Sequence, residues 1–96
     1  MAYASKIVLE LPLSDERALQ SFVEACLRDG VSLIAVVGEG ASRVDDMIDE
    51  LVVGDGSDTG RYITTTMHPD EAVEDAIQFA ANWEAELGGA VQLVRL

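Results

Sequence analysis

Residues 31–37 read Val-Ser-Leu-Ile-Ala-Val-Val, a nearly continuous apolar run with one serine in it. A strand covered on only one face alternates apolar and polar residues, whereas a strand covered on both faces stays apolar along its length. The run therefore predicts a strand inside a sheet that carries helices on both sides. The chain on either side of this run determines how that sheet is completed.

The segment before the run predicts a strand followed by a helix. Residues 4–11 alternate around apolar positions, and Pro12 ends the strand because proline has no amide hydrogen to donate. Ser14 is the expected N-cap of the helix, and Gly30 is expected to follow its last turn. The apolar stripe of this helix repeats at spacings of three and four residues. It consists of Ala18, Leu19, Phe22, Val23, Cys26 and Leu27.

The segment after the run alternates in the same way. A glycine-rich loop at 38–40 leads into a predicted helix over 41–53, and a polar loop follows at 54–60. Residues 61–66 are rich in β-branched side chains and predict another strand. Because that strand is more polar than residues 31–37, it is expected at an edge of the sheet.

A last helix and a last strand complete the chain. We expect the helix to span 69–87, because proline is favoured at the first helical position and Pro69 would occupy it. Asp70 and Glu71 would then face the positive end of the helix dipole. Residues 91–96 predict the final strand.

Strands that alternate with helices across short loops predict parallel pairing through right-handed crossovers. Residues 1–96 are therefore expected to form a single α/β domain, β-α-β-α-β-α-β, with a four-stranded, mostly parallel sheet and helices on both faces. Strand order 3-2-1-4 is preferred because it places the apolar strand inside; order 2-1-3-4 is the alternative. Both orders put two helices on one face and one on the other. Part of the sheet then stays uncovered, which favours a homodimer.

Charge is the second informative feature. The chain holds 18 acidic and six basic residues, a formal net charge of −12. Such a charge repels nucleic acids and anionic membranes, so we predict neither as a partner. The acids form two carboxylate-rich helix faces, where ordinary surfaces mix both signs. These faces contain Asp45, Asp46, Asp49 and Glu50 on one helix, and Asp70, Glu71, Glu74 and Asp75, with Glu84 and Glu86, on another.

The acidic faces predict a non-enzymatic protein-interaction domain, such as an inhibitor, adaptor or regulatory subunit with a basic partner. One alternative is a small-ligand or enzymatic site at the carboxyl edge of the sheet, where open α/β sheets bind ligands. Its candidate residues are Glu39, Ser42, Arg43 and His68. The loop there lacks a third glycine, because Arg43 stands in its place, so the dinucleotide-binding pattern is incomplete. The other alternative is a self-associating structural subunit.

No metal site, cofactor or disulfide is predicted. Asp55, Ser57 and Thr59 resemble the start of a calcium-binding loop, but the twelfth position is Thr66 rather than a glutamate. Cys26 is the only cysteine, and its place on the apolar stripe predicts a buried thiol. A chain without disulfides is expected in the cytoplasm. No apolar run approaches the 18 or so residues of a membrane span.

Overall fold

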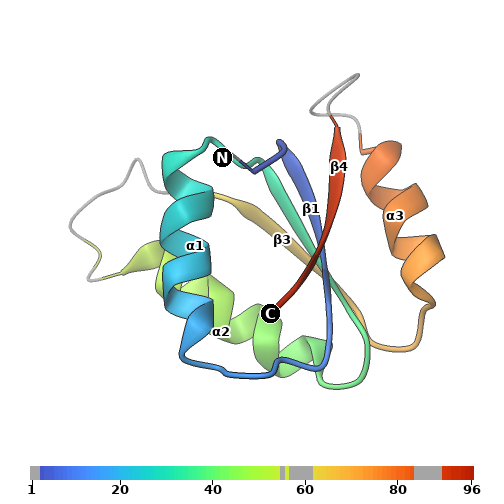
Figure 1. Cartoon of the computed structure of the whole chain (residues 1–96), viewed down its shortest axis with the longest axis horizontal. Coiled ribbons are helices and arrows are strands. Elements are labelled where there is room, and N and C mark those ends of the chain that lie inside the picture. Colours follow the sequence, from blue (N-terminus) through green and yellow to red (C-terminus); the bar gives the residue numbers. More distant parts are fainter. Residues whose placement is uncertain (1–2, 55, 57–61, 84–89) are drawn as a thin grey trace.

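The computed structural model describes residues 3–54, 56, 62–83 and 90–96, and its ribbon is shown in Figure 1. The elements are β1 (Lys6–Glu10), α1 (Ala18–Arg28), β2 (Leu33–Val37), α2 (Ala41–Val53), β3 (Thr64–His68), α3 (Val73–Ala81) and β4 (Val91–Arg95). The four strands pair in parallel in the order β3-β2-β1-β4. The predicted α/β class and the preferred strand order are confirmed, and the alternative order 2-1-3-4 is wrong.

The apolar run forms the interior strand that its composition predicts. All five residues of β2 are buried, and β1 and β3 pair with its two sides. The turn after β2 needs glycine, because Gly38 and Gly40 both adopt positive φ angles, of 119° and 87°. These glycines therefore set where the chain leaves the sheet and enters α2.

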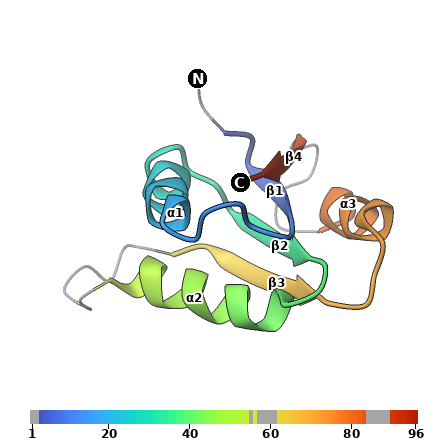
Figure 2. The ribbon, with the colours of Figure 1, turned by 60° about the horizontal axis from the view of Figure 1, so that its bottom comes forward.

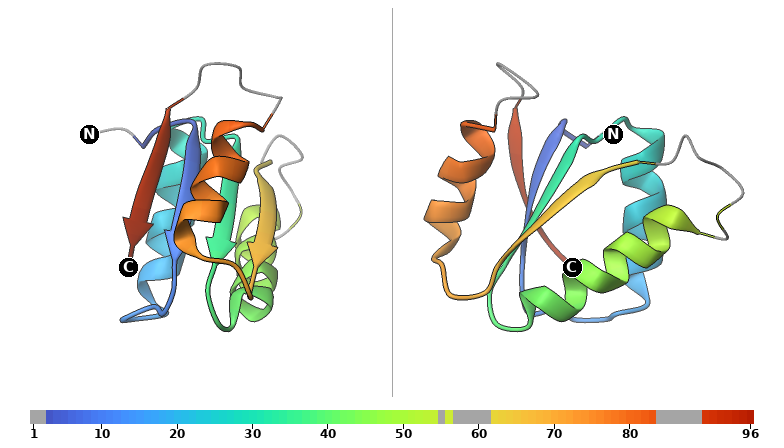
Figure 3. Two further views of the ribbon diagram at one scale, coloured as in Figure 1. Left: turned by 90° about the vertical axis from the view of Figure 1, so that its right-hand side faces the viewer. Right: turned by 180° about the vertical axis from the view of Figure 1, so that it is seen from behind.

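Two helical layers sandwich the sheet, as Figures 2 and 3 show: α1 and α2 cover one face, and α3 covers the other. Alternation along each strand divides the core between the two faces. The strand residues that pack beneath α1 and α2 are Ile7, Leu9, Ile34, Val36 and Val94. Those on the α3 side are Val8, Leu33, Ala35 and Val37.

The single helix α3 leaves part of its face of the sheet uncovered. Ala76 and Ala80 are fully buried against the central strands, so the helix backbone rests close to the sheet. On the edge strand β4, by contrast, Leu93 remains 38% exposed. The expectation that one helix would not hide all four strands is therefore confirmed.

Two predicted helix starts are wrong. Ser14 does not cap α1, whose first residue is Ala18 and whose N-cap is Arg17. Instead, the Asp15 carboxylate accepts a hydrogen bond from the Arg17 backbone amide at 2.9 Å, so the chain turns once more before the helix begins.

The last helix begins at Val73 rather than at residue 69, because the chain has to cross from the edge of the sheet onto its face. Pro69 lies in a turn directly after β3, and Ala72 is the N-cap with an extended backbone. The strand β3 also lies later than the predicted 61–66, because its register with β2 pairs Leu33 with Thr64 and Val37 with His68.

Several predicted features fall outside the described residues. They are the polar loop and strand start at 55 and 57–61, and the end of the last helix at 84–89, with Glu84 and Glu86. Among the helices that are described, none is long and apolar enough to cross a membrane.

Candidate functional site

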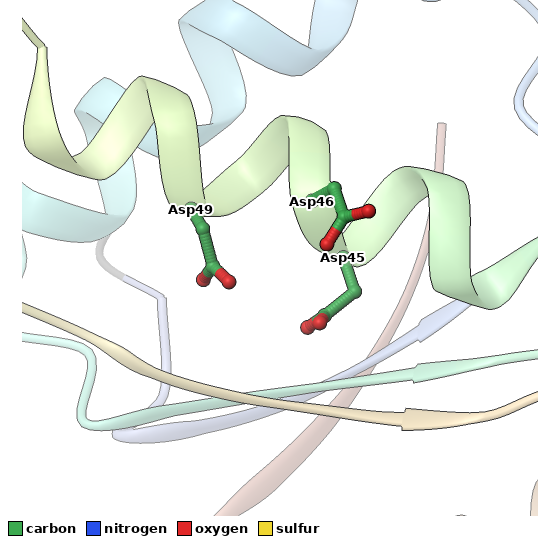
Figure 4. Close-up of side chains that lie close together, drawn as sticks. All are labelled: Asp45, Asp46 and Asp49. Atoms are coloured by element: carbon green, nitrogen blue, oxygen red, sulfur yellow. The ribbon is translucent and has the colours of Figure 1, made fainter.

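The acidic face of α2 contains a tight group of three aspartates. Oxygen atoms of Asp45, Asp46 and Asp49 lie within 4.8 Å of one another. Figure 4 shows that Asp45 and Asp49 point from α2 toward the edge strand β3. There the Thr65 hydroxyl donates a hydrogen bond of 2.6 Å to Oδ1 of Asp49. The group therefore links α2 to β3 and concentrates negative charge between them.

Within this group, Asp45 has the least favourable surroundings for a charged carboxylate. Its Oδ1 atom is buried and has no hydrogen-bond partner among the described residues. Burial raises the pKa of the Asp45 carboxyl, and the charges of Asp49 and Asp46 add to the rise, while the Thr65 hydroxyl opposes it. Because Thr65 has one hydroxyl proton, which the geometry directs to Asp49, its relief of Asp45 is limited.

We expect Asp45→Asn to stabilise the protein at pH 7 by about 0.5 kcal/mol, because the change removes a partly buried charge that is also repelled by Asp49 at position i+4. A carboxyl whose pKa is raised by folding destabilises the folded state above that pKa. The cost decreases as the pH falls through the folded pKa, and it vanishes below the pKa of the unfolded chain. Urea unfolding at several pH values measures the difference.

The matched control is Asp46→Asn, which removes the same charge from an exposed position of the same helix. It is expected to stabilise the protein less and to leave more of the pH dependence in place. Equal gains for the two variants, or a gain for Asp45→Asn that does not shrink at low pH, would contradict the argument from burial.

The second predicted acidic face lies elsewhere on the molecule. Glu74 and Asp75 occupy the exposed first turn of α3, and Asp70 and Glu71 lie in the turn before it. Since α2 and α3 cover opposite faces of the sheet (Figure 3), the two carboxylate-rich faces are separate surfaces. One partner surface would therefore not contact both faces head-on.

The basic residues that the structure describes are already engaged. Each of the four described arginines forms an ion pair with an acid, and the pairs are Arg17–Asp15, Arg28–Asp29, Arg43–Glu16 and Arg95–Glu10. Lys6 is fully buried, and its Nζ atom donates to the backbone oxygen of Trp83 at 3.2 Å. Within the described part of the chain, then, no arginine or lysine forms an ion pair with the carboxylates of α2 or of α3.

His68, at the carboxyl end of β3, is held by partners that the sequence did not suggest. Its Nδ1 atom lies 2.7 Å from Oε2 of Glu71, its Nε2 atom lies 2.9 Å from Oγ1 of Thr66, and its ring packs on Phe79. The spacing of these residues in the sequence could have indicated the contacts, because Thr66 and His68 share one face of a strand and Glu71 follows three residues later.

A hydroxyl, an imidazole and a carboxylate in this order resemble a hydrolase triad. However, His68 is only 6% exposed and lies beneath Phe79, so its ring nitrogens are shielded from a substrate. The ring lies on the α3 side of the sheet and ties β3 to the turn that follows. Neither ring nitrogen is bonded to Glu39 or Ser42, so the structure does not join His68 to these other candidates of the carboxyl edge.

The remaining edge candidates lie on the α2 side. Glu39, Gly40 and Arg43 line a cavity of about 220 Å³ together with Glu16, and Ser42 is exposed nearby on α2. Arg43 donates to Glu16, so its charge is already balanced there. Two carboxylates beside a neutralised guanidinium offer little attraction for an anion.

Cys26 is fully buried in α1, as predicted. Burial raises the pKa of its thiol to about 12, and the nearby carboxylate of Asp29 contributes. At neutral pH this cysteine is therefore a protonated core residue rather than a nucleophile.

The sheet, the three helices and the carboxylate faces define a small acidic α/β domain. The chain belongs to the family described as a domain of unknown function, DUF7684, which it matches over residues 5–94. That region runs from the start of β1 to within one residue of the end of β4. No curated protein and no solved structure matches the chain.

Proposed function

We propose that this protein is a non-enzymatic interaction domain, acting as an inhibitor, adaptor or regulatory subunit that offers carboxylates of α2 and α3 to a basic protein. The observation that carries the proposal is the distribution of charge. The four described arginines are paired with other acids, while the acids of α2 and α3 have no arginine or lysine partner within the described residues. A partner rich in lysine or arginine would supply the missing cations.

The physical basis is mutual repulsion that a partner relieves. Carboxylates crowded on one helix raise one another's energy: burial is the main reason that the pKa of Asp45 is raised, and the charges of Asp49 and Asp46 add to the rise. A cationic surface lowers that energy, and the negative field also steers the partner and speeds association. The interaction is therefore expected to weaken as salt screens the charges.

The test uses a labelled peptide of about twelve residues that alternates lysine with serine, with binding followed by fluorescence anisotropy at low and physiological ionic strength. Three double variants each raise the net charge by two. Asp46→Asn/Asp49→Asn neutralises the face of α2, and Glu74→Gln/Asp75→Asn neutralises that of α3. Glu10→Gln/Asp15→Asn is the matched control, because both of its acids are paired with arginines.

We expect the peptide to bind the wild type and to dissociate as salt is added. At least one helix-face variant is expected to weaken binding about five- to tenfold, as the loss of close charge pairs does. The control is expected to change binding less than twofold. Absence of binding at low ionic strength, or equal weakening by all three variants, would overturn the proposal, because equal losses report net charge and not a surface.

Two further parts of the proposal concern location and assembly. A cytoplasmic location is supported by the single, buried cysteine. Self-association through the sheet stays a prediction, favoured by the half-exposed Leu93 on the edge strand β4. Light scattering over a range of concentrations decides that point, and a strict monomer is the adverse outcome.

A further inference from the structure

A groove of about 620 Å³ lies between α1 and α2, which cover the same face of the sheet. Met47 and Leu51 of α2 supply its apolar side chains, and both are half-buried. Neither methionine nor leucine has a polar atom that demands a fixed partner, and methionine adapts readily to different shapes. The middle of the groove is therefore suited to receiving an apolar side chain.

Carboxylates surround these apolar side chains. Glu16 and Glu24 line the groove from the α1 side, and Glu50 lines it from α2. Among the described residues of the lining, Arg17 is the only cationic one, and it is paired with Asp15. The charge around the groove is thus predominantly negative.

Arg43 marks one end of the groove. Its guanidinium donates to Sδ of Met47 at 3.0 Å and to the carboxylate of Glu16, so it bridges α2 and the start of α1. Glu50, toward the opposite end, is exposed. A basic partner would therefore place its cations mainly at that end.

We propose that this groove binds a basic amphipathic helix of a partner protein, with an apolar side chain between Met47 and Leu51 and flanking lysines or arginines beside the glutamates. The proposal rests on the proposed function, because it takes the partner to be basic. A helix fits because an amphipathic helix lays its apolar face into a groove with apolar side chains in its middle and exposes its charged residues to the rim. Charge complementarity selects a basic helix over an acidic or neutral one.

The probe is a labelled peptide with leucine at helical spacings of three and four and lysine at the other positions. The control peptide has the same composition in scrambled order. We expect the amphipathic peptide to bind at least tenfold more tightly, because only it aligns its leucines on one face. Equal affinities for the two peptides would overturn the groove.

Variants locate the binding. Met47→Gln keeps the length of the side chain but makes the middle of the groove polar. It is expected to weaken binding of the amphipathic peptide about fivefold. Met67→Gln is the matched control, because Met67 is 47% exposed on β3 and outside the groove lining. Equal effects of the two variants would count against the proposal. Circular dichroism of both variants shows that the fold is retained.

Amide shifts in a nuclear magnetic resonance titration give an independent readout. On addition of the amphipathic peptide, shifts confined to α1 and α2 around the groove are expected, and shifts concentrated on α3 would overturn the proposal. Suppose that both peptides bind equally while the helix-face variants weaken their binding. In that case the groove proposal is wrong and the proposed function stands. If neither peptide binds at low ionic strength, both fail.

Discussion

Replacing Leu9 by alanine is expected to lower the free energy of unfolding by about 3–4 kcal/mol. Leu9 is fully buried in β1, between β2 and β4 and beneath the α1–α2 layer. Removing its side chain loses burial and leaves a cavity that packed neighbours fill only in part. Because a domain of this size has roughly 5–15 kcal/mol of stability in total, the loss should be evident in urea unfolding followed by circular dichroism.

Leu93→Ala is the control for Leu9→Ala. It makes the same substitution on another strand of the same sheet, at a residue that is 38% exposed. We expect it to cost less than half as much, because part of the side chain is already in water and the edge of the sheet can adjust. A Leu9→Ala cost no greater than that of Leu93→Ala would show that the sheet interior is not packed as described.

Enlarging Ala76 to leucine is expected to destabilise the protein by about 2–3 kcal/mol. Ala76 is fully buried where α3 rests on the central strands, in the same cluster as Val8 and Ala35. Three additional carbon atoms have no space there, so α3 must move away from the sheet or its neighbours must leave their preferred rotamers. Chemical unfolding measures the loss, and near-ultraviolet circular dichroism reports the changed surroundings of Trp83, which packs against this cluster.

The matched variant is Ala81→Leu, at the exposed last residue of α3. Both alanine and leucine are good helix formers, so this change is expected to alter stability by no more than about 0.5 kcal/mol. If Ala76→Leu proved as mild as Ala81→Leu, the close approach of α3 to the sheet would be wrong.

Local pattern was sufficient for most of the fold. The apolar run placed β2 in the interior, and glycines at both ends of one amphipathic stripe predicted α2 at its observed bounds, 41–53. Local pattern gave the wrong start for α3, because Pro69 is a favourable first helical residue. There the need to cross from the sheet edge to its face overrode the local preference, and the helix began four residues later.

The candidate sites divide in a similar way. The sequence identified the acidic residues of α2 and α3, but it did not show that they lie on opposite faces of the sheet. It also proposed His68 without its observed partners, Thr66 and Glu71, because hydrogen bonds depend on side-chain placement.

By itself, the sequence determined the layered α/β architecture and the excess of negative charge, since both follow from the order and types of residues along the chain. Only the tertiary structure decided which charges meet. Packing α1 beside α2 brings Glu16 and Glu24 to the same groove as Glu50, although Glu24 and Glu50 are 26 positions apart in the chain. The reason is that periodicity fixes which face of each element is buried, whereas the neighbours of the remaining face depend on how the elements pack.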